Sequence, residues 1–108
     1  MLTHAEQMAL SRFSAWLNER FGARLRELKL FGSRARGDSH EESDLDVAIV
    51  VDDLAASEAR EVGYFSGDLL TEFCVVVSPF VVSTAHMDHL RTRERAIAFE
   101  IERDGVPL

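Results

Sequence analysis

The chain has 108 residues, of which 46% are hydrophobic and 29% are charged, and this predicts one globular domain over residues 1–108. The side chains include 19 acidic against 12 basic ones, and the formal net charge of −7 argues against direct binding to DNA. The N-terminus lacks a cationic segment with an apolar run, and nothing approaches the roughly 20 apolar residues of a membrane span. We therefore expect a cytoplasmic protein with no membrane contact.

The first half of the chain predicts one helix and two strands. Thr3 and Glu6 form a T-x-x-E capping box, and apolar residues recur at helical spacing over residues 4–21. The short segment LRELKLF, residues 25–31, predicts a half-buried strand. The β-branched run LDVAIVV, residues 45–51, is typical of a central strand covered on at least one face.

The second half predicts a helix and a strand at the sheet edge. Asp52 and Asp53 close the central strand and are placed to cap a helix over residues 54–70. The next strand, residues 73–83, contains Pro79, which cannot donate a hydrogen bond to a neighbouring strand. This strand should therefore lie at a sheet edge or carry a bulge.

The C-terminal segment completes a small α/β (α+β) domain. Ser83 or Thr84 caps a final helical region that Gly105 ends. The element order predicts a small mixed sheet flanked by helices. The single cysteine, Cys74, excludes an internal disulfide, and its apolar neighbours predict a buried thiol.

The turn between the first two strands has the residues of a phosphate-binding loop. If Gly32 and Ser33 open a helical turn, backbone N–H groups and the serine hydroxyl face the strand end. Glycine lets the backbone approach an anion closely, and serine adds a hydroxyl donor without bulk. The turn therefore predicts a phosphate contact.

Two arginines follow this turn, and the sequence leaves two interpretations of them open. Arg34 and Arg36 either contact phosphate or pair with acidic residues of the same loop. The candidate acidic partners are Asp38, Glu41 and Glu42.

Two aspartates mark the start of the central strand. Asp44 and Asp46 are two residues apart, so their side chains leave the same face with Cα atoms about 6.6–7 Å apart. Two like charges this close are unfavourable, and Mg²⁺ would relieve the repulsion while binding phosphate oxygens. Taken alone, the pair is more typical of solvated carboxylates at a strand start. Together with the turn at Gly32, it predicts a magnesium-bound polyphosphate.

Gly32-Ser33, ten intervening residues and Asp44-Leu45-Asp46 resemble the signature of the DNA polymerase beta-like nucleotidyltransferase superfamily. The run GSRARGDSHEESDLDVAIVV resembles its minimal nucleotidyltransferase (MNT) branch. The resemblance implies the polymerase beta-like palm fold and transfer of a nucleoside monophosphate from an NTP, with ATP as the expected donor. It also implies two Mg²⁺ ions, with Ser33 on the phosphates, Gly32 permitting the turn, and Asp44 and Asp46 as metal ligands.

The chain departs from this pattern at a third carboxylate, which active superfamily members carry on the neighbouring strand. Here that strand reads CVVVSPFVVS and contains no acid. Ser78 stands where the acid is expected, and a hydroxyl is a poor Mg²⁺ ligand and no base at neutral pH. Glu72 lies six residues, roughly 20 Å, away along an extended strand and would substitute only if the strand were bent.

Different functions therefore remain open. The first is an MNT-type enzyme that adenylylates a protein or a small molecule; the resemblance implies a HEPN-domain partner, with this chain as antitoxin. The second is a catalytically inactive module that binds nucleotide or protein. Antibiotic nucleotidylation is a weaker third, because the chain has no second domain to hold a drug. The strand edge at Pro79 and the small size favour a homodimer or a heterocomplex.

Overall fold

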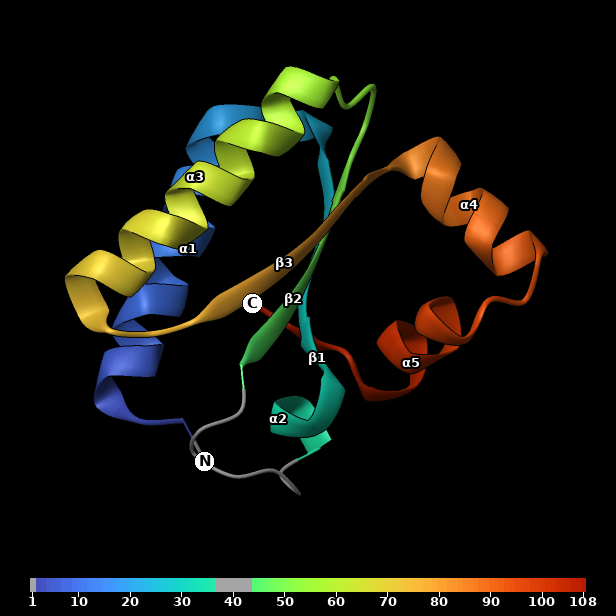
Figure 1. Cartoon of the computed structure of the whole chain (residues 1–108). Helices are drawn as coiled ribbons and strands as arrows, with labels where there is room; N and C mark the ends of the chain where they lie inside the picture. Colours follow the sequence, from blue (N-terminus) through green and yellow to red (C-terminus); the bar gives the residue numbers. More distant parts are fainter. Residues whose placement is uncertain (1, 37–43) are drawn as a thin grey trace.

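The computed structural model describes residues 2–36 and 44–108, and it confirms the predicted small mixed sheet flanked by helices (Figure 1). No helix within these two ranges is long and apolar enough to cross a membrane. The elements in chain order are α1 (His4–Phe21), the 3-10 turn η1 (Gly22–Arg24), β1 (Leu25–Phe31), α2 (Gly32–Arg36), β2 (Leu45–Val51), α3 (Ala56–Phe73), β3 (Val77–Ser83), α4 (Thr84–Thr92), α5 (Ala96–Asp104) and β4 (Val106–Pro107).

The sheet has the strand order β3-β2-β1-β4, so β2 is central, as its β-branched sequence predicts. It pairs antiparallel with β1 and parallel with β3. Pro79 lies in β3, and the prediction that this strand lies at a sheet edge is confirmed. In the register of the sheet, Asp46 has Phe31 on one side and Ser78 on the other.

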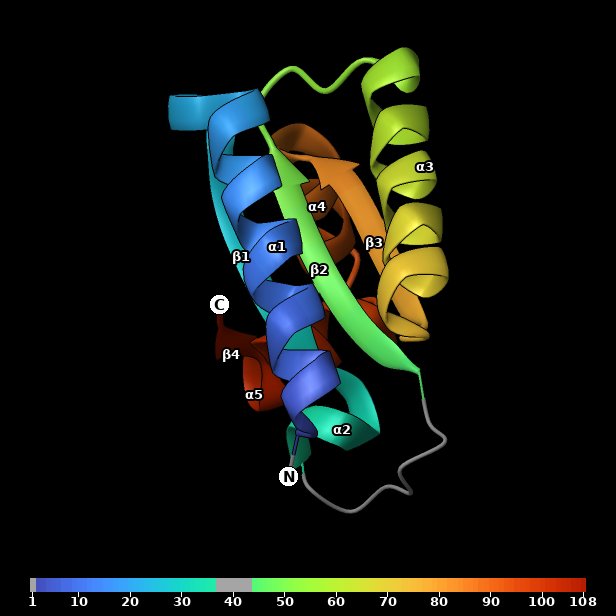
Figure 2. The same ribbon diagram turned by 90° about the vertical axis from the view of Figure 1, so that its left-hand side faces the viewer.

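Helices cover both faces of the sheet and create two hydrophobic cores. Helices α1 and α3 pack on one face, and α4 and α5 pack on the other (Figures 1 and 2). Because successive side chains of a strand point to opposite faces, β2 contributes to both cores. The α1/α3 core contains Leu45, Val47, Ile49 and Val51, and the α4/α5 core contains Ala48, Val50, Phe31, Met87, Ala98 and Ile101.

The predicted start of the helix after β2 and the predicted single C-terminal helix need correction, because local hydrogen bonds and backbone conformation set the helix ends. Asp52 and Asp53 do not cap α3; its N-cap is Ala55, whose N–H donates to the Glu58 carboxylate at 2.9 Å. The predicted final helix is two helices, α4 and α5, and Glu94 adopts a positive φ of 52° between them. Ser83 does cap α4, as predicted.

The segment after α3 also differs from the prediction. The helix continues to Phe73, and Cys74 ends it in the left-handed conformation with φ 57°. The Cys74 side chain is exposed, so the predicted buried thiol is wrong: alternate residues of this run, Val75 and Val77, are buried instead. Strand β4 was not predicted, because a two-residue strand depends on its pairing with β1 rather than on its own sequence.

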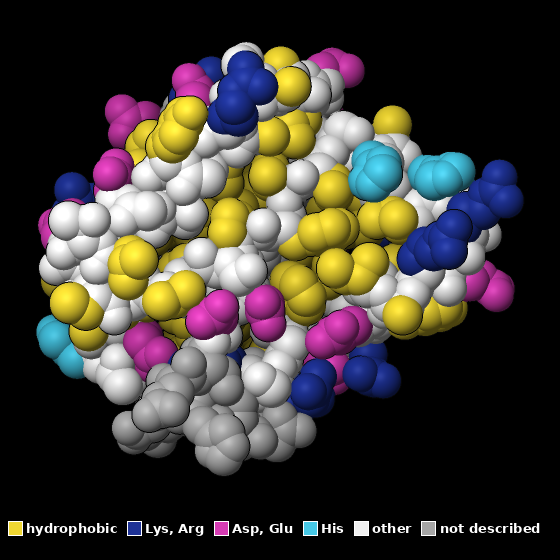
Figure 3. Space-filling view, in the orientation of Figure 1, with side chains coloured by type: hydrophobic (Ala, Val, Ile, Leu, Met, Phe, Trp, Pro, Cys, Tyr) yellow, Lys and Arg dark blue, Asp and Glu magenta, His cyan; other side chains and the backbone are white. Residues whose placement is uncertain are grey.

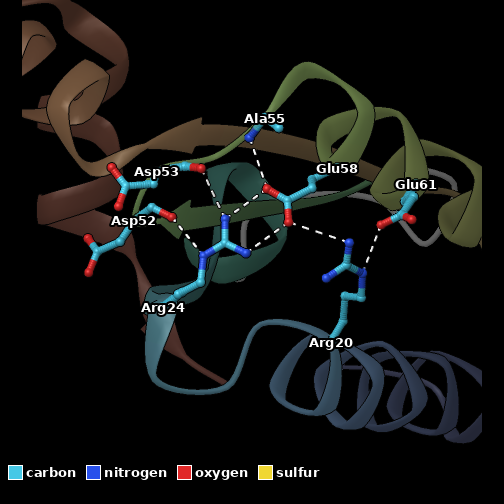
Figure 4. A network of polar contacts seen from close by, with 7 residues as sticks. All are labelled: Arg20, Arg24, Asp52, Asp53, Ala55, Glu58 and Glu61. Atoms are coloured by element: carbon cyan, nitrogen blue, oxygen red, sulfur yellow. Dashed lines mark hydrogen bonds and ion pairs between the residues drawn. The ribbon is translucent and has the colours of Figure 1, made fainter.

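An arginine clamp joins three elements at the sheet end where β2 finishes (Figure 4). Arg24 donates to the two Glu58 carboxylate oxygens at 2.8 and 2.7 Å. It also donates to the backbone carbonyls of Asp52 and Asp53, each at 3.0 Å. The clamp therefore joins η1, which precedes β1, to the two residues that follow β2 and to the first turn of α3.

We expect this clamp to make stability pH-dependent in acid. Hydrogen bonds from Arg24 and from the Ala55 N–H lower the pKa of Glu58 to about 2. The stabilisation is complete above the ordinary pKa of glutamate and is lost as the pH falls towards the folded value. The thermal midpoint of Glu58→Gln should lie below that of wild type at pH 7, and the gap should close between about pH 4.5 and pH 2. Glu61→Gln, which removes the same charge on the same helix, should show no comparable closing gap.

Candidate functional site

The predicted turn lies directly against one of the predicted aspartates. Strand β1 ends at Phe31, and Gly32 turns the chain into α2 with a φ of +76°. A Cβ atom on this buried glycine would lie 3.3 Å from the Asp46 Cγ and would collide with the Asp46 carboxylate oxygen Oδ2. The backbone therefore favours glycine, and any side chain at this position would displace the Asp46 carboxylate. Ser33 follows, half-buried, as the second residue of α2.

The two aspartates occupy the start of β2 in different environments. Asp44 is exposed just before the strand, whereas Asp46 is half-buried inside it. Burial, followed by the negative charges of Asp44 and Glu100, raises the pKa of Asp46 above its usual value. The ionised site is therefore electrostatically unfavourable on its own, and a cation would relieve that cost. The hard carboxylate oxygens of both residues suit a divalent ion such as Mg²⁺.

The strand next to these aspartates provides no third carboxylate. Ser78, the residue expected at the position of the missing acid, pairs with Asp46 across the parallel strands, and its side chain is exposed. Glu72 is in helix α3 and pairs with Arg12 at 2.7 Å, so the bent strand through which it would have to substitute is not formed. Among the residues that the structure describes, no group of three or more His, Cys, Asp or Glu side chains is arranged to hold a metal ion.

The first arginine of α2 joins this short helix to the start of α1. Arg34 is buried and donates to the Glu6 carboxylate at 2.5 Å. Glu6 also accepts from the Thr3 N–H at 2.8 Å, within the capping box that the sequence predicted. The hydrogen bond from Arg34 is the main cause of a lowered Glu6 pKa. The sequence pattern identifies Glu6 as a capping residue, whereas its ion pair with Arg34 is visible only in the fold.

The second arginine joins α2 to α5. The Arg36 guanidinium donates to Asp104 at 3.2 Å and lies 3.6 Å from a Glu100 carboxylate oxygen. Both acids lie on α5, four residues apart and thus on one helix face. The loop partners predicted for the two arginines, Asp38, Glu41 and Glu42, lie outside the described residues. Phosphate contact by Arg34 or Arg36 stays a prediction.

The family follows from a match over most of the chain. Residues 10–103 match the model of the nucleotidyltransferase domain family, and the chain therefore belongs to this family. It also shares 45% identity over 47 residues with a protein of Methanocaldococcus jannaschii (strain ATCC 43067 / DSM 2661 / JAL-1 / JCM 10045 / NBRC 100440) named "Putative protein adenylyltransferase". That match covers 44% of this chain and 47% of the relative, so it spans about half of the relative's length.

Solved structures confirm the fold. A chain described as a "putative minimal nucleotidyltransferase" matches with a TM-score of 0.58 and 24% identity, over 94% of both chains. A toxin-antitoxin structure with AMP-PNP matches with a TM-score of 0.56 and 21% identity, covering 89% of this chain and 69% of that one. A structure of a mutant of the toxin-antitoxin MntA-HpeT matches with a TM-score of 0.52 and 17% identity, covering 88% of this chain and 68% of that one. The predicted resemblance to minimal nucleotidyltransferases is thus confirmed for the fold.

Proposed function

We propose that this chain binds Mg²⁺ and a nucleoside triphosphate, with ATP as the expected donor, and transfers the nucleoside monophosphate to a hydroxyl acceptor. The acceptor oxygen forms a bond to the α-phosphorus, the bond from that phosphorus to the pyrophosphate oxygen breaks, and the hydroxyl proton passes to water. The main support is the contact between the Gly32 turn and the Asp46 carboxylate in a chain of the nucleotidyltransferase domain family.

Each site residue has one role in this proposal. Asp44 and Asp46 would hold the metal, which when bound supplies positive charge to the phosphates of the nucleotide. Ser33 would donate its hydroxyl to a phosphate oxygen, and the positive φ of Gly32 aims the chain so that α2 begins beside Asp46. Arg36 would add a cationic contact. Positioning and charge neutralisation supply most of the acceleration in phosphoryl-type transfers.

The exposed serine at position 78 favours a second candidate function. A module with two carboxylates could bind Mg²⁺ and ATP without transferring nucleotide, because Ser78 is neither a strong ligand nor a base. Such a module would act through a protein partner. The toxin-antitoxin neighbours make a toxin the partner to test first, and a HEPN-domain protein is the specific candidate that the MNT resemblance implies.

Labelled ATP separates the two candidates. The purified chain is incubated with Mg²⁺ and ATP labelled at the α-phosphate, alone and with candidate acceptor proteins, and both binding and label transfer are measured. Transfer that EDTA abolishes supports the enzyme. Binding that requires Mg²⁺ without any transfer supports the module. A chain that neither binds nor transfers contradicts both.

A further inference from the structure

The predicted phosphate turn lies on a helix that is too short to be stable by itself. Helix α2 has five residues, whereas an isolated helix needs about 12–15 residues to form in water. Ala35 packs against the α1/α3 core, but the sequence GSRAR offers no larger apolar side chain. The position of Ser33 therefore depends on the two arginines that follow it.

Arg34 forms an ion pair with Glu6 inside the protein. The two side chains are 4% and 9% exposed, and they are the buried charged side chains in the part of the chain that the structure describes. Arg36, in contrast, is exposed, and Figure 3 shows basic side chains at the surface beside α5. A nucleotide that arrives from solvent therefore meets Arg36 first, and Arg34 lies beneath the surface.

The buried ion pair contributes orientation more than stability. A buried pair loses its hydration, and an apolar pair of similar size is often at least as stabilising. A guanidinium, however, binds a carboxylate in a defined direction, which an apolar contact does not. The ion pair between Arg34 and Glu6 therefore fixes how α2 meets α1.

The carboxylate that receives Arg34 is itself held by the backbone of α1. Glu6 Oε1 accepts from the Thr3 N–H at 2.8 Å, and the Thr3 hydroxyl accepts from the Glu6 N–H at 3.1 Å. The same Oε1 atom accepts from the Arg34 guanidinium. Figure 2 shows the start of α1 beside α2. A helix of 18 residues thus presents a fixed acceptor to the residue that follows Ser33.

We propose that Glu6 and Arg34 are positioning residues for the phosphate turn: their ion pair holds Ser33 where its hydroxyl meets a phosphate oxygen of the nucleotide. The inference rests on the proposed function. The turn is fixed on one side by the close approach of Gly32 to Asp46 and on the other side by Arg34. Arg34 acts through Glu6 and makes no direct contact with phosphate.

Binding of nucleotide and of metal, measured separately, tests this inference without turnover. The nucleotide probe is an ATP analogue with a methylene group between the α- and β-phosphorus, which cannot release pyrophosphate, and it is titrated calorimetrically with Mg²⁺ present. Free Mn²⁺ is followed by electron paramagnetic resonance in a titration without nucleotide. Glu6→Gln should bind the analogue about tenfold more weakly, roughly the loss of one hydrogen bond to a charged phosphate. Its Mn²⁺ affinity should stay within about twofold of wild type, because Asp44 and Asp46 lie at the start of β2 rather than on α2.

Glu58→Gln is the matched control for Glu6→Gln. Glu58 is also the third residue of its helix, accepts from the backbone N–H of the N-cap residue and binds an arginine, but at the opposite end of the sheet. Glu58→Gln should therefore lose stability and still bind the analogue within about twofold of wild type. All variants are assayed below their thermal midpoints. If Glu6→Gln does not fold, Glu6→Asp, which keeps the charge but draws it back by one methylene group, takes its place.

Arg34→Met in two backgrounds shows whether Arg34 acts through Glu6. We expect this change to weaken analogue binding about tenfold in the wild-type chain and by less than about twofold in Glu6→Gln. Unchanged or tighter analogue binding by Glu6→Gln, or an equal loss from Arg34→Met in both backgrounds, would overturn this inference alone. Loss of Mn²⁺ affinity in Glu6→Gln, or loss of analogue binding in Glu58→Gln, would show a general effect of lower stability and would overturn it as well. A wild-type chain that does not bind the analogue would overturn the proposed function and this inference with it.

Discussion

Asparagine at positions 44 and 46 is expected to lower the rate of nucleotide transfer strongly while leaving the chain folded. Asparagine keeps the shape of both side chains but removes both negative charges, and a neutral amide is a much weaker ligand for Mg²⁺. Loss of metal-supplied charge stabilisation of about 4 kcal/mol lowers the transfer rate about 10³-fold. Label transfer from ATP with Mg²⁺ measures this change. Asp53→Asn, which removes a carboxylate at the opposite end of β2, should transfer at the wild-type rate.

The single substitution Asp46→Asn should raise the stability of the fold when no metal is present. The pKa of Asp46 is raised in the folded chain, so the stability it contributes is present at low pH and is lost as the pH rises through the folded pKa. At pH 7 wild type carries this cost and Asp46→Asn does not. The variant should therefore have the higher thermal midpoint without metal, and Mg²⁺ should raise the midpoint of wild type only. A lower midpoint for Asp46→Asn would show that its carboxylate stabilises the fold and would contradict this account.

Replacing the aspartates should lower activity but raise stability, and this conflict explains why acidic residues at the start of a buried strand stand out in the sequence. A run of acidic residues beside the most buried strand opposes folding, and such conflicts are typical of functional sites. This conflict made Asp44 and Asp46 visible without a structure. The turn was equally visible, because glycine followed by a small polar residue is typical of a chain that passes close to a ligand.

The contacts that sequence analysis missed are those that join distant elements. Glu6 looked only like a capping residue, and its ion pair with Arg34 depends on where the start of α1 lies relative to α2. Glu100 looked like one acid among several on an amphipathic helix. Its ion pair with Arg36 depends on where α5 packs relative to α2, and spacing along the chain carries no information about that packing. The Cys74 error has a local cause, since a helix that continues to Phe73 changes which residues of the following run face the core.

Alanine at Gly32 is expected to lower both stability and metal binding. The φ of +76° costs an alanine about 1–2 kcal/mol, and its Cβ would push the Asp46 carboxylate away from the turn. At about 4 °C per kcal/mol, the backbone cost alone lowers the thermal midpoint by roughly 4–8 °C. The displaced carboxylate should also weaken Mn²⁺ binding about tenfold or more, because one ligand of the predicted pair has moved.

Two other glycines separate the backbone effect from the collision. Gly22 also has a positive φ, +55°, but an added Cβ would meet nothing within 4 Å. Gly22→Ala should therefore lower the thermal midpoint without changing Mn²⁺ affinity. Gly67 lies inside α3 with open space around it, so Gly67→Ala should raise the free energy of unfolding by about 0.5–1 kcal/mol. If Gly32→Ala loses stability but binds Mn²⁺ as wild type does, the turn and Asp46 do not form one site, and the assignment of the nucleotide to this corner of the sheet is wrong.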